Sequence, residues 1–304
     1  MKTKYTVVSF YCFTSFNQDL ITNLRNQLLE LGKESITGLL ILAEEGINGT
    51  VCGEKQLINQ FFSLIKYFVG DKDLNKKISY SEKNVYKRLK VKIKLEVVTM
   101  GQNDIDNVSN NGTYLDSFQW NEFLEDENTL IIDTRNKYEI NLGSFEKAIN
   151  PNTDNFKEFP EWVDKHLEQF DVSKKETKIG MFCTGGIRCE KATSLLKLKG
   201  YKNVFHLKGG ILKYLETIPN EKNLYKGECY VFDDRVSVDH NLNKGSYTIC
   251  HACGWPVSDR DKTKPEYIEG IQCHFCIEKF TDQDRKRFAE RQKQFDKRRS
   301  NSEN

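Results

Sequence analysis

One cysteine stands at the end of an apolar run and is followed at once by a glycine-rich loop. The run occupies residues 179–182, Cys183 comes next, and Met-Phe-Cys-Thr-Gly-Gly-Ile-Arg-Cys-Glu-Lys spans 181–191. This order predicts a strand, a tight loop and the start of a helix. Such a loop turns successive backbone N–H groups inward and ends at a helix N-terminus, and both features favour negative charge. The Cys183 thiol is therefore expected to lose its proton readily and to act as a nucleophile.

The other loop residues are expected to line an anion-binding cradle. Their N–H groups would face its centre and the arginine would add positive charge; the residues are Thr184, Gly185, Gly186, Ile187 and Arg188. The alternative is a buried structural cysteine, because free cysteines are among the most buried residues. Cys189 follows one residue past the cradle, so we interpret it as a packing residue or a resolving thiol.

A second chemical site is indicated by two Cys-x-x-Cys pairs. Each pair places two thiolates on a tight knuckle, and together the pairs provide tetrahedral sulfur coordination. Zinc is the default metal for four such ligands, and the site would be structural because every coordination position is filled. His251 and His274 adjoin the pairs and could substitute for the ligands or support them. The predicted zinc ligands are Cys250, Cys253, Cys273 and Cys276. The alternative to a zinc site is that the two pairs are redox couples.

A row of cations suggests a partner. Residues 88–98 alternate, which predicts a strand with one apolar and one cationic face. The row either contacts nucleic-acid phosphates or prevents edge-to-edge aggregation of strands. A charged helix predicted over 281–299 has acidic residues between its cations, which is typical of a solvated helix. Together the two features favour RNA or another polyanion; the candidate RNA-binding residues are Lys87, Arg88, Lys90, Lys92 and Lys94.

The composition restricts the class of protein. The 304 residues carry a formal net charge of +2, which by itself says little about partners. No run reaches the ~18 apolar residues of a membrane helix, and the first residues lack the pattern of a signal peptide. The nine cysteines are an odd number, and four of them form the paired motifs. We expect a reducing cytoplasm, metal-binding and catalytic thiols, and no membrane partner.

The elements that must position these residues form three regions of an α/β multidomain protein. Residues 1–100 read β-α-β-β-α-β, which predicts a ferredoxin-like (acylphosphatase-like) α+β domain whose last strand is 88–98. Residues 101–125 are polar and are predicted to be a linker that ends in a short helix. Residues 126–220 alternate strands with helices, which predicts a parallel sheet. Residues 221–304 form a small cysteine-rich region with a basic helix.

The predicted parallel sheet brings a carboxylate close to the loop. Asp133 ends the apolar run 130–132, and functional sites of such sheets lie at the carboxyl ends of the strands. We expect Asp133 to orient the cysteine loop and to form the catalytic group with Cys183 and Arg188. A strand-end turn with an ordinary Arg135 is the alternative.

The middle region resembles a rhodanese. The similarity lies in Ile-Asp-Thr-Arg at 132–135 with Tyr-Glu at 138–139, the segment 143–151 that ends in Ala-Ile-Asn-Pro, the cysteine loop 183–188, and the segment 201–210 that ends in two glycines. The resemblance implies a rhodanese α/β domain, in agreement with the alternation of strands and helices. By itself it would imply sulfur transfer to a small acceptor.

The whole chain is similar to a narrower group, the rhodanese-fold tRNA uridine hydroxylase family. The matching segments are 45–50, 87–92, 181–191 and 230–236, together with the cysteine pairs. The resemblance implies conversion of uridine 34, the wobble base in the tRNA anticodon loop, to 5-hydroxyuridine. It also implies molecular oxygen as co-substrate and Cys183 as the essential cysteine. No flavin, haem or iron motif is visible in the sequence.

Other functions stay open at this point. A sulfurtransferase would carry a persulfide on Cys183, within the N–H groups of residues 184–188, and pass the sulfur to a thiol or cyanide. A non-catalytic RNA-binding protein would contain an idle rhodanese domain, although the presence of Cys183 argues against it. In a hydroxylase, the thiolate could add to C6 of the uracil, which makes C5 nucleophilic, or carry an oxidised sulfur species.

Overall fold

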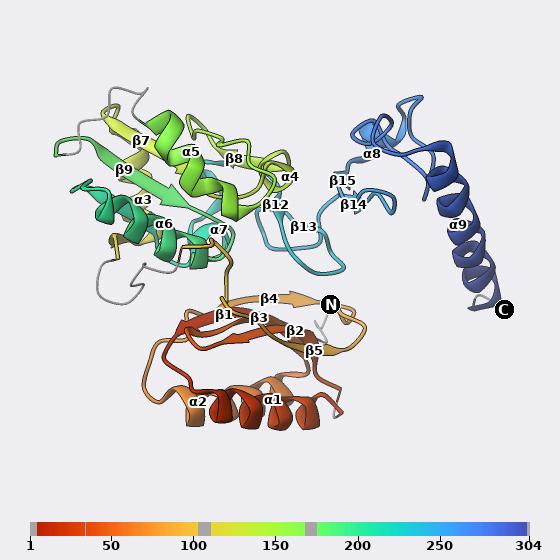
Figure 1. Cartoon of the computed structure of the whole chain (residues 1–304), viewed down its shortest axis with the longest axis horizontal. Coiled ribbons are helices and arrows are strands. Elements are labelled where there is room, and N and C mark those ends of the chain that lie inside the picture. Colours follow the sequence, from red (N-terminus) through yellow and green to blue (C-terminus); the bar gives the residue numbers. More distant parts are fainter. Residues whose placement is uncertain (1–4, 34, 103–110, 168–174, 303–304) are drawn as a thin grey trace.

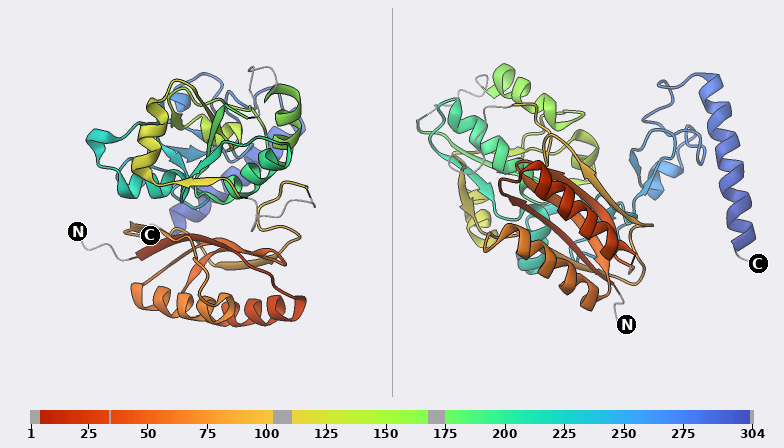
Figure 2. Two further views of the ribbon diagram at one scale, coloured as in Figure 1. Left: turned by 90° about the vertical axis from the view of Figure 1, so that its left-hand side faces the viewer. Right: turned by 60° about the horizontal axis from the view of Figure 1, so that its bottom comes forward.

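The computed structural model describes residues 5–33, 35–102, 111–167 and 175–302. Figure 1 shows a lower layer from the N-terminal region, an upper α/β layer from the middle of the chain, and a C-terminal extension to one side. The view turned by 90° in Figure 2 shows the upper layer stacked on the lower one. None of the described helices combines the length and the apolar character needed to cross a membrane.

The lower layer is a five-stranded sheet with two helices on its outer face (Figure 1). The strand order is β4-β1-β3-β2-β5; neighbours are antiparallel except for β5, which runs parallel to β2. The elements are β1 (Tyr5–Phe13), α1 (Gln18–Gly32), β2 (Thr37–Ala43), β3 (Gly46–Gly53), α2 (Lys55–Val69), β4 (Lys77–Ser81) and β5 (Leu89–Ile93).

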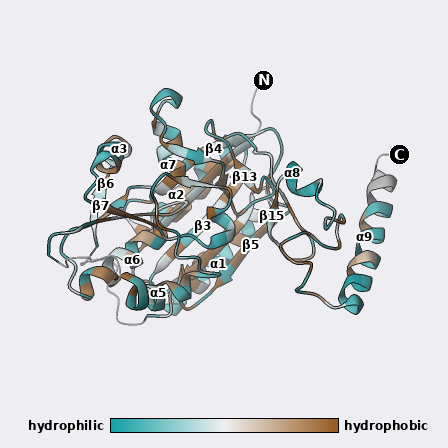
Figure 3. Ribbon diagram, turned by 90° about the horizontal axis from the view of Figure 1, so that it is seen from above, coloured by the Kyte–Doolittle hydropathy of each residue, from teal (hydrophilic) through white to brown (hydrophobic). Residues whose placement is uncertain are grey.

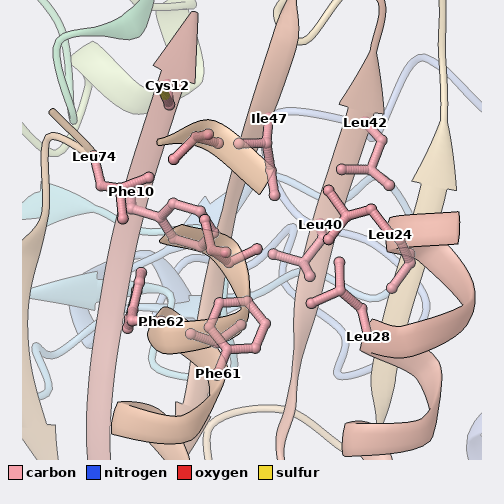
Figure 4. Packing of buried hydrophobic residues seen from close by; sticks show 14 of the residues in the cluster. Phe10, Cys12, Leu24, Leu28, Leu40, Leu42, Ile47, Phe61, Phe62 and Leu74 are labelled. Carbon is pink, nitrogen blue, oxygen red and sulfur yellow. The ribbon is translucent and has the colours of Figure 1, made fainter. Parts of the chain in front are cut away.

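The outer helices hold the lower layer together through one apolar core. Leu24 and Leu28 lie four residues apart on one face of α1, and Figure 4 shows them beside Leu40 of β2. Phe61 of α2 packs edge-on against Phe10 of β1, with ring centroids 5.8 Å apart. Burying each such side chain contributes about 1.5–3 kcal/mol. The opposite face of the sheet is thereby left to pack against the upper layer.

The ferredoxin-like prediction is confirmed, but its last strand lies elsewhere. The fourth strand is β4, which the sequence analysis did not predict, and the predicted strand 88–98 supplies only the short additional strand β5. From the last residue of β5 onward the expected burial of the apolar side chains fails, since Ile93 is 46% and Leu95 95% exposed. The physical reason is that β5 is an edge strand that pairs only with β2. After β5 the chain leaves the sheet, and its apolar side chains are exposed until Val97 is buried again.

The upper layer is a parallel sheet in the order β6-β10-β9-β7 with helices on both faces (Figure 1). This confirms the predicted fold class. Its elements are β6 (Thr113–Leu115), α3 (Ser117–Glu125), β7 (Thr129–Asp133), α4 (Lys137–Ile140), β8 (Gly143–Phe145), η1 (Phe156–Glu158), α5 (Phe159–His166), β9 (Lys178–Phe182), α6 (Ile187–Leu198), β10 (Val204–Leu207) and α7 (Gly210–Thr217).

The segment predicted as a linker over 101–125 contains part of this sheet. Tyr114 of β6 pairs in parallel with His206 of β10, and Asp116 caps α3 with its side chain. A three-residue strand is invisible in the local pattern, because its pairing partner lies far away in the sequence. Residues 103–110 of the predicted linker lie outside the described residues.

The C-terminal extension consists of short hairpins and one long helix. Figure 3 colours most of the long helix α9 as hydrophilic, as predicted for a solvated charged helix. The elements are η3 (Asn220–Lys222), β11 (Tyr225–Gly227), β12 (Cys229–Tyr230), β13 (Ser237–Val238), β14 (Thr248–Ile249), β15 (Pro256–Val257), α8 (Asp259–Lys262) and α9 (Asp282–Ser302).

The two layers meet through an apolar cluster and a buried cation. Lys191 of α6 forms ion pairs with Glu45 at 2.8 Å and Glu96 at 2.7 Å, both from the lower layer. Since Lys191 is nearly fully buried, losing either carboxylate would leave its charge poorly compensated. The buried apolar residues of the contact are Tyr11, Ala43, Val97 and Ile187.

Candidate active site and metal centre

Cys183 follows β9 at the carboxyl end of the parallel sheet. Its Sγ accepts a hydrogen bond from the backbone N–H of Gly186 at 3.1 Å. Gly186 has φ of 96°, and a side chain there would begin 3.2 Å from the Tyr11 hydroxyl of the lower layer. The loop therefore needs glycine for its backbone conformation and for the close approach of the other domain.

Gly209 and Gly210, at the start of α7, support the cysteine loop from behind. The first N–H groups of α7 donate to loop carbonyls, Ile211 N to Cys183 O at 2.9 Å and Leu212 N to Thr184 O at 3.0 Å. A Cβ at Gly210 would lie 2.4 Å from Cys183 O, so no other residue fits there without a shift. The helix thereby fixes the backbone from which the thiol projects.

The Cys183 thiol is acidic although it is buried. Burial raises its pKa. A hydrogen bond from Cys189, the charge of Arg188 and two backbone N–H donors lower the pKa by more than burial raises it, so that it lies at about 6. The N–H donors belong to Gly186 and Arg188. At neutral pH the group is mainly thiolate, the form that reacts.

Arg188 is held by a carboxylate that the sequence analysis missed. Its guanidinium forms two hydrogen bonds with Glu139 of α4, both 2.8 Å, and both side chains are buried. The Thr184 hydroxyl also donates to Glu139, at 3.2 Å. The signal for Glu139 was its place in the Tyr-Glu pair of the rhodanese resemblance, but only the packing of α4 on the loop reveals the contact.

Asp133 lies in the same layer but serves a different arginine. Its carboxylate binds Arg135 at 2.6 and 2.9 Å and accepts a hydrogen bond from the Ser144 hydroxyl at 2.8 Å. Both members of the ion pair are fully buried. None of the hydrogen bonds of Asp133 to described residues reaches the cysteine loop, so the expected orienting contact is not formed. Glu139 makes that contact instead.

A cavity of about 410 Å³ opens above Cys183 where the three regions of the chain meet. This volume falls in the usual range of ligand pockets, ~300–1,000 Å³. Four aromatic rings line it, together with the amides of Asn48 and Asn136. The rings come from all three regions: Tyr86, Tyr138, Phe156 and Phe232.

The predicted cationic row leads only partly to this cavity. Lys94 lines it, whereas Lys87 and Arg88 line a separate hollow at the start of β5. Lys90 and Lys92 are exposed between them. The structure therefore brings one candidate of the row to the cavity of Cys183 and places the others along the sheet edge.

The four predicted cysteine ligands converge in the C-terminal extension. Their sulfur atoms all lie within 4.8 Å of one another. Cys273 Sγ lies 3.7 Å from the sulfurs of both Cys253 and Cys276. Tetrahedral zinc with Zn–S bonds of about 2.3 Å needs sulfur separations of roughly 3.8 Å, so the donor set suits this metal. The cluster of Cys250, Cys253, Cys273 and Cys276 could therefore hold a metal ion.

The two neighbouring histidines point to other partners. His274 Nε2 lies 3.0 Å from Lys264 Nζ and 3.6 Å from Asp261. His251 stacks on Phe295 of α9, with ring centroids 6.0 Å apart. Neither histidine belongs to the group of potential ligands that the described residues form, which consists of the four cysteines.

Two family models agree with this architecture. Residues 5–97 match the UPF0176 acylphosphatase like domain, and residues 119–217 match the rhodanese-like domain. A rhodanese-related protein from Thermoplasma volcanium is 19% identical, with a TM-score of 0.28, over 35% of this chain and 95% of that one. Fold and site define a rhodanese-like protein with an N-terminal acylphosphatase-like domain.

Full-length relatives give the family. A tRNA uridine(34) hydroxylase of Prochlorococcus marinus (strain MIT 9515) is 59% identical over 97% of this chain and 96% of the relative. The protein of that name from strain NATL2A is 50% identical over 97% of this chain and 93% of the relative. The chain belongs to the tRNA uridine(34) hydroxylase family of enzymes. The family resemblance in the sequence is thereby confirmed.

Proposed function

We propose that this chain hydroxylates uridine 34 of tRNA to 5-hydroxyuridine, with molecular oxygen as co-substrate and Cys183 as the reacting thiol. The observation that carries the proposal is the aromatic-lined cavity above an acidic, buried cysteine. Membership in the tRNA uridine(34) hydroxylase family supports the substrate. A cytoplasmic location follows from the same proposal.

The cavity suits an unstacked base. Single-stranded loops of RNA present bases that proteins splay out and stack on aromatic side chains. Tyr86, Tyr138 and Phe232 offer such rings, and Asn48 and Asn136 offer amides for the polar edge of a uracil. An anticodon loop is the part of tRNA that can deliver a base in this way.

Cys183 can activate the base at the position that is hydroxylated. Addition of the thiolate to C6 of the uracil moves electron density to C5, which then attacks an electrophilic oxygen. Loss of the C5 proton then expels the thiolate from C6 and restores the C5–C6 double bond of the base. One oxygen atom of O₂ enters the base, and the other leaves as water after taking two electrons from an external reductant and two protons. An oxidised sulfur on Cys183 is the other route to the same product.

Cations near the cavity would hold the tRNA backbone. Lys94 lines the cavity, and Lys90 and Lys92 continue along the exposed sheet edge. Lys87 and Arg88 extend the row further from the thiol. Phosphate contacts of this kind position the nucleic acid without reading its sequence. The four-cysteine cluster would hold zinc and serve folding, because all four positions are taken by protein.

Mass spectrometry of tRNA nucleosides tests the proposal. A strain that lacks the gene and any second route to 5-hydroxyuridine should lose the modification, and expression of the wild-type chain should restore it. Cys183→Ser should not restore it, because an alkoxide does not form at neutral pH. Restoration by Cys183→Ser would contradict the role of the thiol, and unchanged nucleosides in the deletion strain would contradict the proposed substrate.

A sulfurtransferase activity is the second candidate. The N–H group that Gly186 directs at the sulfur would also stabilise a persulfide on Cys183. A thiosulfate-to-cyanide assay on purified protein, with Cys183→Ser as the control, separates the two functions. Thiocyanate formation that depends on Cys183 in a protein unable to restore the tRNA modification would favour sulfur transfer.

A further inference from the structure

A buried lysine from the lower layer lies against the back of the cysteine loop. Lys77 begins β4, which contacts α7 of the upper layer (Figure 1), and only 4% of the residue is exposed. Its ammonium lies over the ring of Tyr11, 4.3 Å from the centroid. The point where a side chain on Gly185 would begin is 4.0 Å from Lys77 Nζ. The cation therefore lies beside the loop, and Lys77 is not among the residues that line the cavity above the thiol.

The charges around the loop leave this cation without a bound carboxylate. Arg188 is neutralised by Glu139, and Lys191 by Glu45 and Glu96. Lys77 forms no ion pair with any carboxylate that the structure describes, within the 4.0 Å that defines such a pair. A buried ammonium in this position needs a nearby anion to offset its loss of hydration.

Glu190 is close to this place but is satisfied by neutral donors. Its carboxylate accepts hydrogen bonds from the hydroxyls of Tyr11 at 2.6 Å and Tyr114 at 2.7 Å, and from the amide of Asn111 at 2.7 Å. Tyr11 thus contacts Lys77 with its ring and Glu190 with its hydroxyl. Three anionic groups interact with Lys77; Asp73 is exposed to solvent and Glu190 is held by neutral donors, which leaves the buried thiolate of Cys183.

The titratable groups that face these two residues come from several elements. Tyr11 of β1, Cys229 of β12, and Arg188, Cys189 and Glu190 of α6 interact with Cys183. Asp73, Glu190, Lys213 and the thiol itself interact with Lys77. Lys77 interacts with the same thiol, so Arg188 and Lys77 are the cations among the groups that interact with Cys183, and Arg188 is already bound by Glu139.

We propose that Lys77 is the counter-ion of the Cys183 thiolate, so that the N-terminal domain activates the cysteine of the rhodanese-like domain. The proton step is an exchange within the buried pair: the S–H bond of Cys183 breaks, an N–H bond forms on the neutral Lys77 amine, and a thiolate and an ammonium result. No electrons are transferred. Lys77 acts through Cys183 and is a positioning residue. The inference rests on Cys183 being the reacting thiol of the proposed function.

The acidities of the two groups agree with such a pair. Burial lowers the pKa of Lys77 to about 7, although the thiolate and Glu190 work against this effect. Burial raises the pKa of Cys183, but the donors and charge at the loop bring it to about 6. Both groups are therefore charged in a window just below neutral pH.

The test measures the acidity of Cys183 in the full-length protein. The rate of alkylation by iodoacetamide is followed against pH, and modification of Cys183 is quantified by peptide mass spectrometry. Lys77→Met removes the charge and should raise the midpoint by about one pH unit, so that at about pH 5 alkylation slows roughly tenfold. Lys77→Arg keeps a cation and should leave the midpoint near that of the wild type.

A matched control is the preceding residue. Lys76 Nζ lies over the ring of Phe62, 3.8 Å from its centroid, within the lower layer, so Lys76→Met should not move the midpoint. Circular dichroism checks folding, and Lys77→Gln replaces Lys77→Met if the latter does not fold. A folded charge-free variant with the wild-type midpoint would overturn the proposal, and so would equal shifts in Lys77→Arg and Lys77→Met.

The outcome is independent of the tRNA assay. If the midpoint is raised in Lys77→Met and the wild-type chain does not restore 5-hydroxyuridine, the counter-ion is supported and the hydroxylase is rejected. If the midpoint is unchanged in Lys77→Met and the wild-type chain restores the modification, the counter-ion is rejected and the hydroxylase stays in place.

Discussion

At the scale of single residues, the two buried carboxylates beside the sheet end have separate tasks. Asp133 binds Arg135 and Ser144, whereas Glu139 binds Arg188 and Thr184 of the loop. A pattern along the sequence places both residues near the strand end. Which of them reaches the loop depends on how α4 packs, because side chains a few residues apart point in different directions.

Asp133→Asn should strongly destabilise the protein. The substitution keeps the shape of the side chain but leaves the fully buried Arg135 without a countercharge. Breaking a buried pair by removing one partner costs about 3–5 kcal/mol. Urea denaturation followed by fluorescence measures the free energy of unfolding.

Ser144→Ala removes one hydrogen bond of the Asp133 carboxylate and should lower the free energy of unfolding by about 1 kcal/mol.

The Asp133→Asn variant separates a structural from a catalytic role of Asp133. Folded Asp133→Asn should keep the wild-type pH profile of Cys183 alkylation. A shifted profile would show that Asp133 does act on the loop.

At the scale of elements, the edge strand β5 and the turn after it carry the exposed cationic row, of which Lys94 lines the cavity. Lys92→Ala and Lys94→Ala should each weaken tRNA binding and reduce the slope of log K against log salt by about 0.7–0.9, the value per phosphate contact. The measurement is a titration of tRNA at several salt concentrations. Lys66→Ala on the outer helix α2 is the control and should leave the slope unchanged.

An unaltered slope in Lys92→Ala and Lys94→Ala would favour the alternative role of the row. The lysines would then protect an exposed strand edge from pairing with other chains. In that case the variants should aggregate more readily than the wild type, which light scattering detects.

The four-cysteine cluster should determine the order of its region. The surrounding strands have two residues each, so few backbone hydrogen bonds hold this part without metal. Elemental analysis should find about one zinc per chain, and Cys253→Ser should lower this value and make residues 246–280 sensitive to proteases. Cys183→Ser should retain the metal. Well under one zinc per chain in fresh protein would contradict the site.

At the scale of the whole molecule, the cavity exists only because three regions meet. The lower layer contributes Tyr86, the upper layer Tyr138 and the thiol, and the C-terminal extension Phe232. The Tyr86 hydroxyl donates to the backbone carbonyl of Phe232 at 3.0 Å, which ties two of these walls together. Neither layer alone would enclose a base.

Phe232→Ala should lower kcat/KM for tRNA by about tenfold, since stacking of one base contributes roughly 1–3 kcal/mol. Phe232→Tyr keeps the ring and should retain activity. Phe118 is equally exposed, at 50% like Phe232, but lies on α3 outside the cavity, so Phe118→Ala is the matched control. Equal losses in Phe118→Ala and Phe232→Ala would remove Phe232 from the binding site.

Much of this arrangement could be predicted from local patterns. Periodicity located most helices and strands, and residue spacing located the cysteine loop and the four sulfur ligands. Several short strands escaped, among them β4 and β6, because strands of two to five residues are recognised by their partners rather than by their own sequence. Missing β4 meant missing Lys77, the buried cation behind the loop.

The sequence by itself determined the chemistry available to this protein: a cysteine at a strand end, a glycine-rich turn, an arginine and two thiol pairs. These depend on short-range geometry, which neighbouring residues impose. Only the tertiary structure decided which charges surround Cys183, because Glu139, Tyr11 and Lys77 reach the loop from other elements. The acidity of a buried thiol depends on such groups in space, and their positions follow from the packing of one layer on the other.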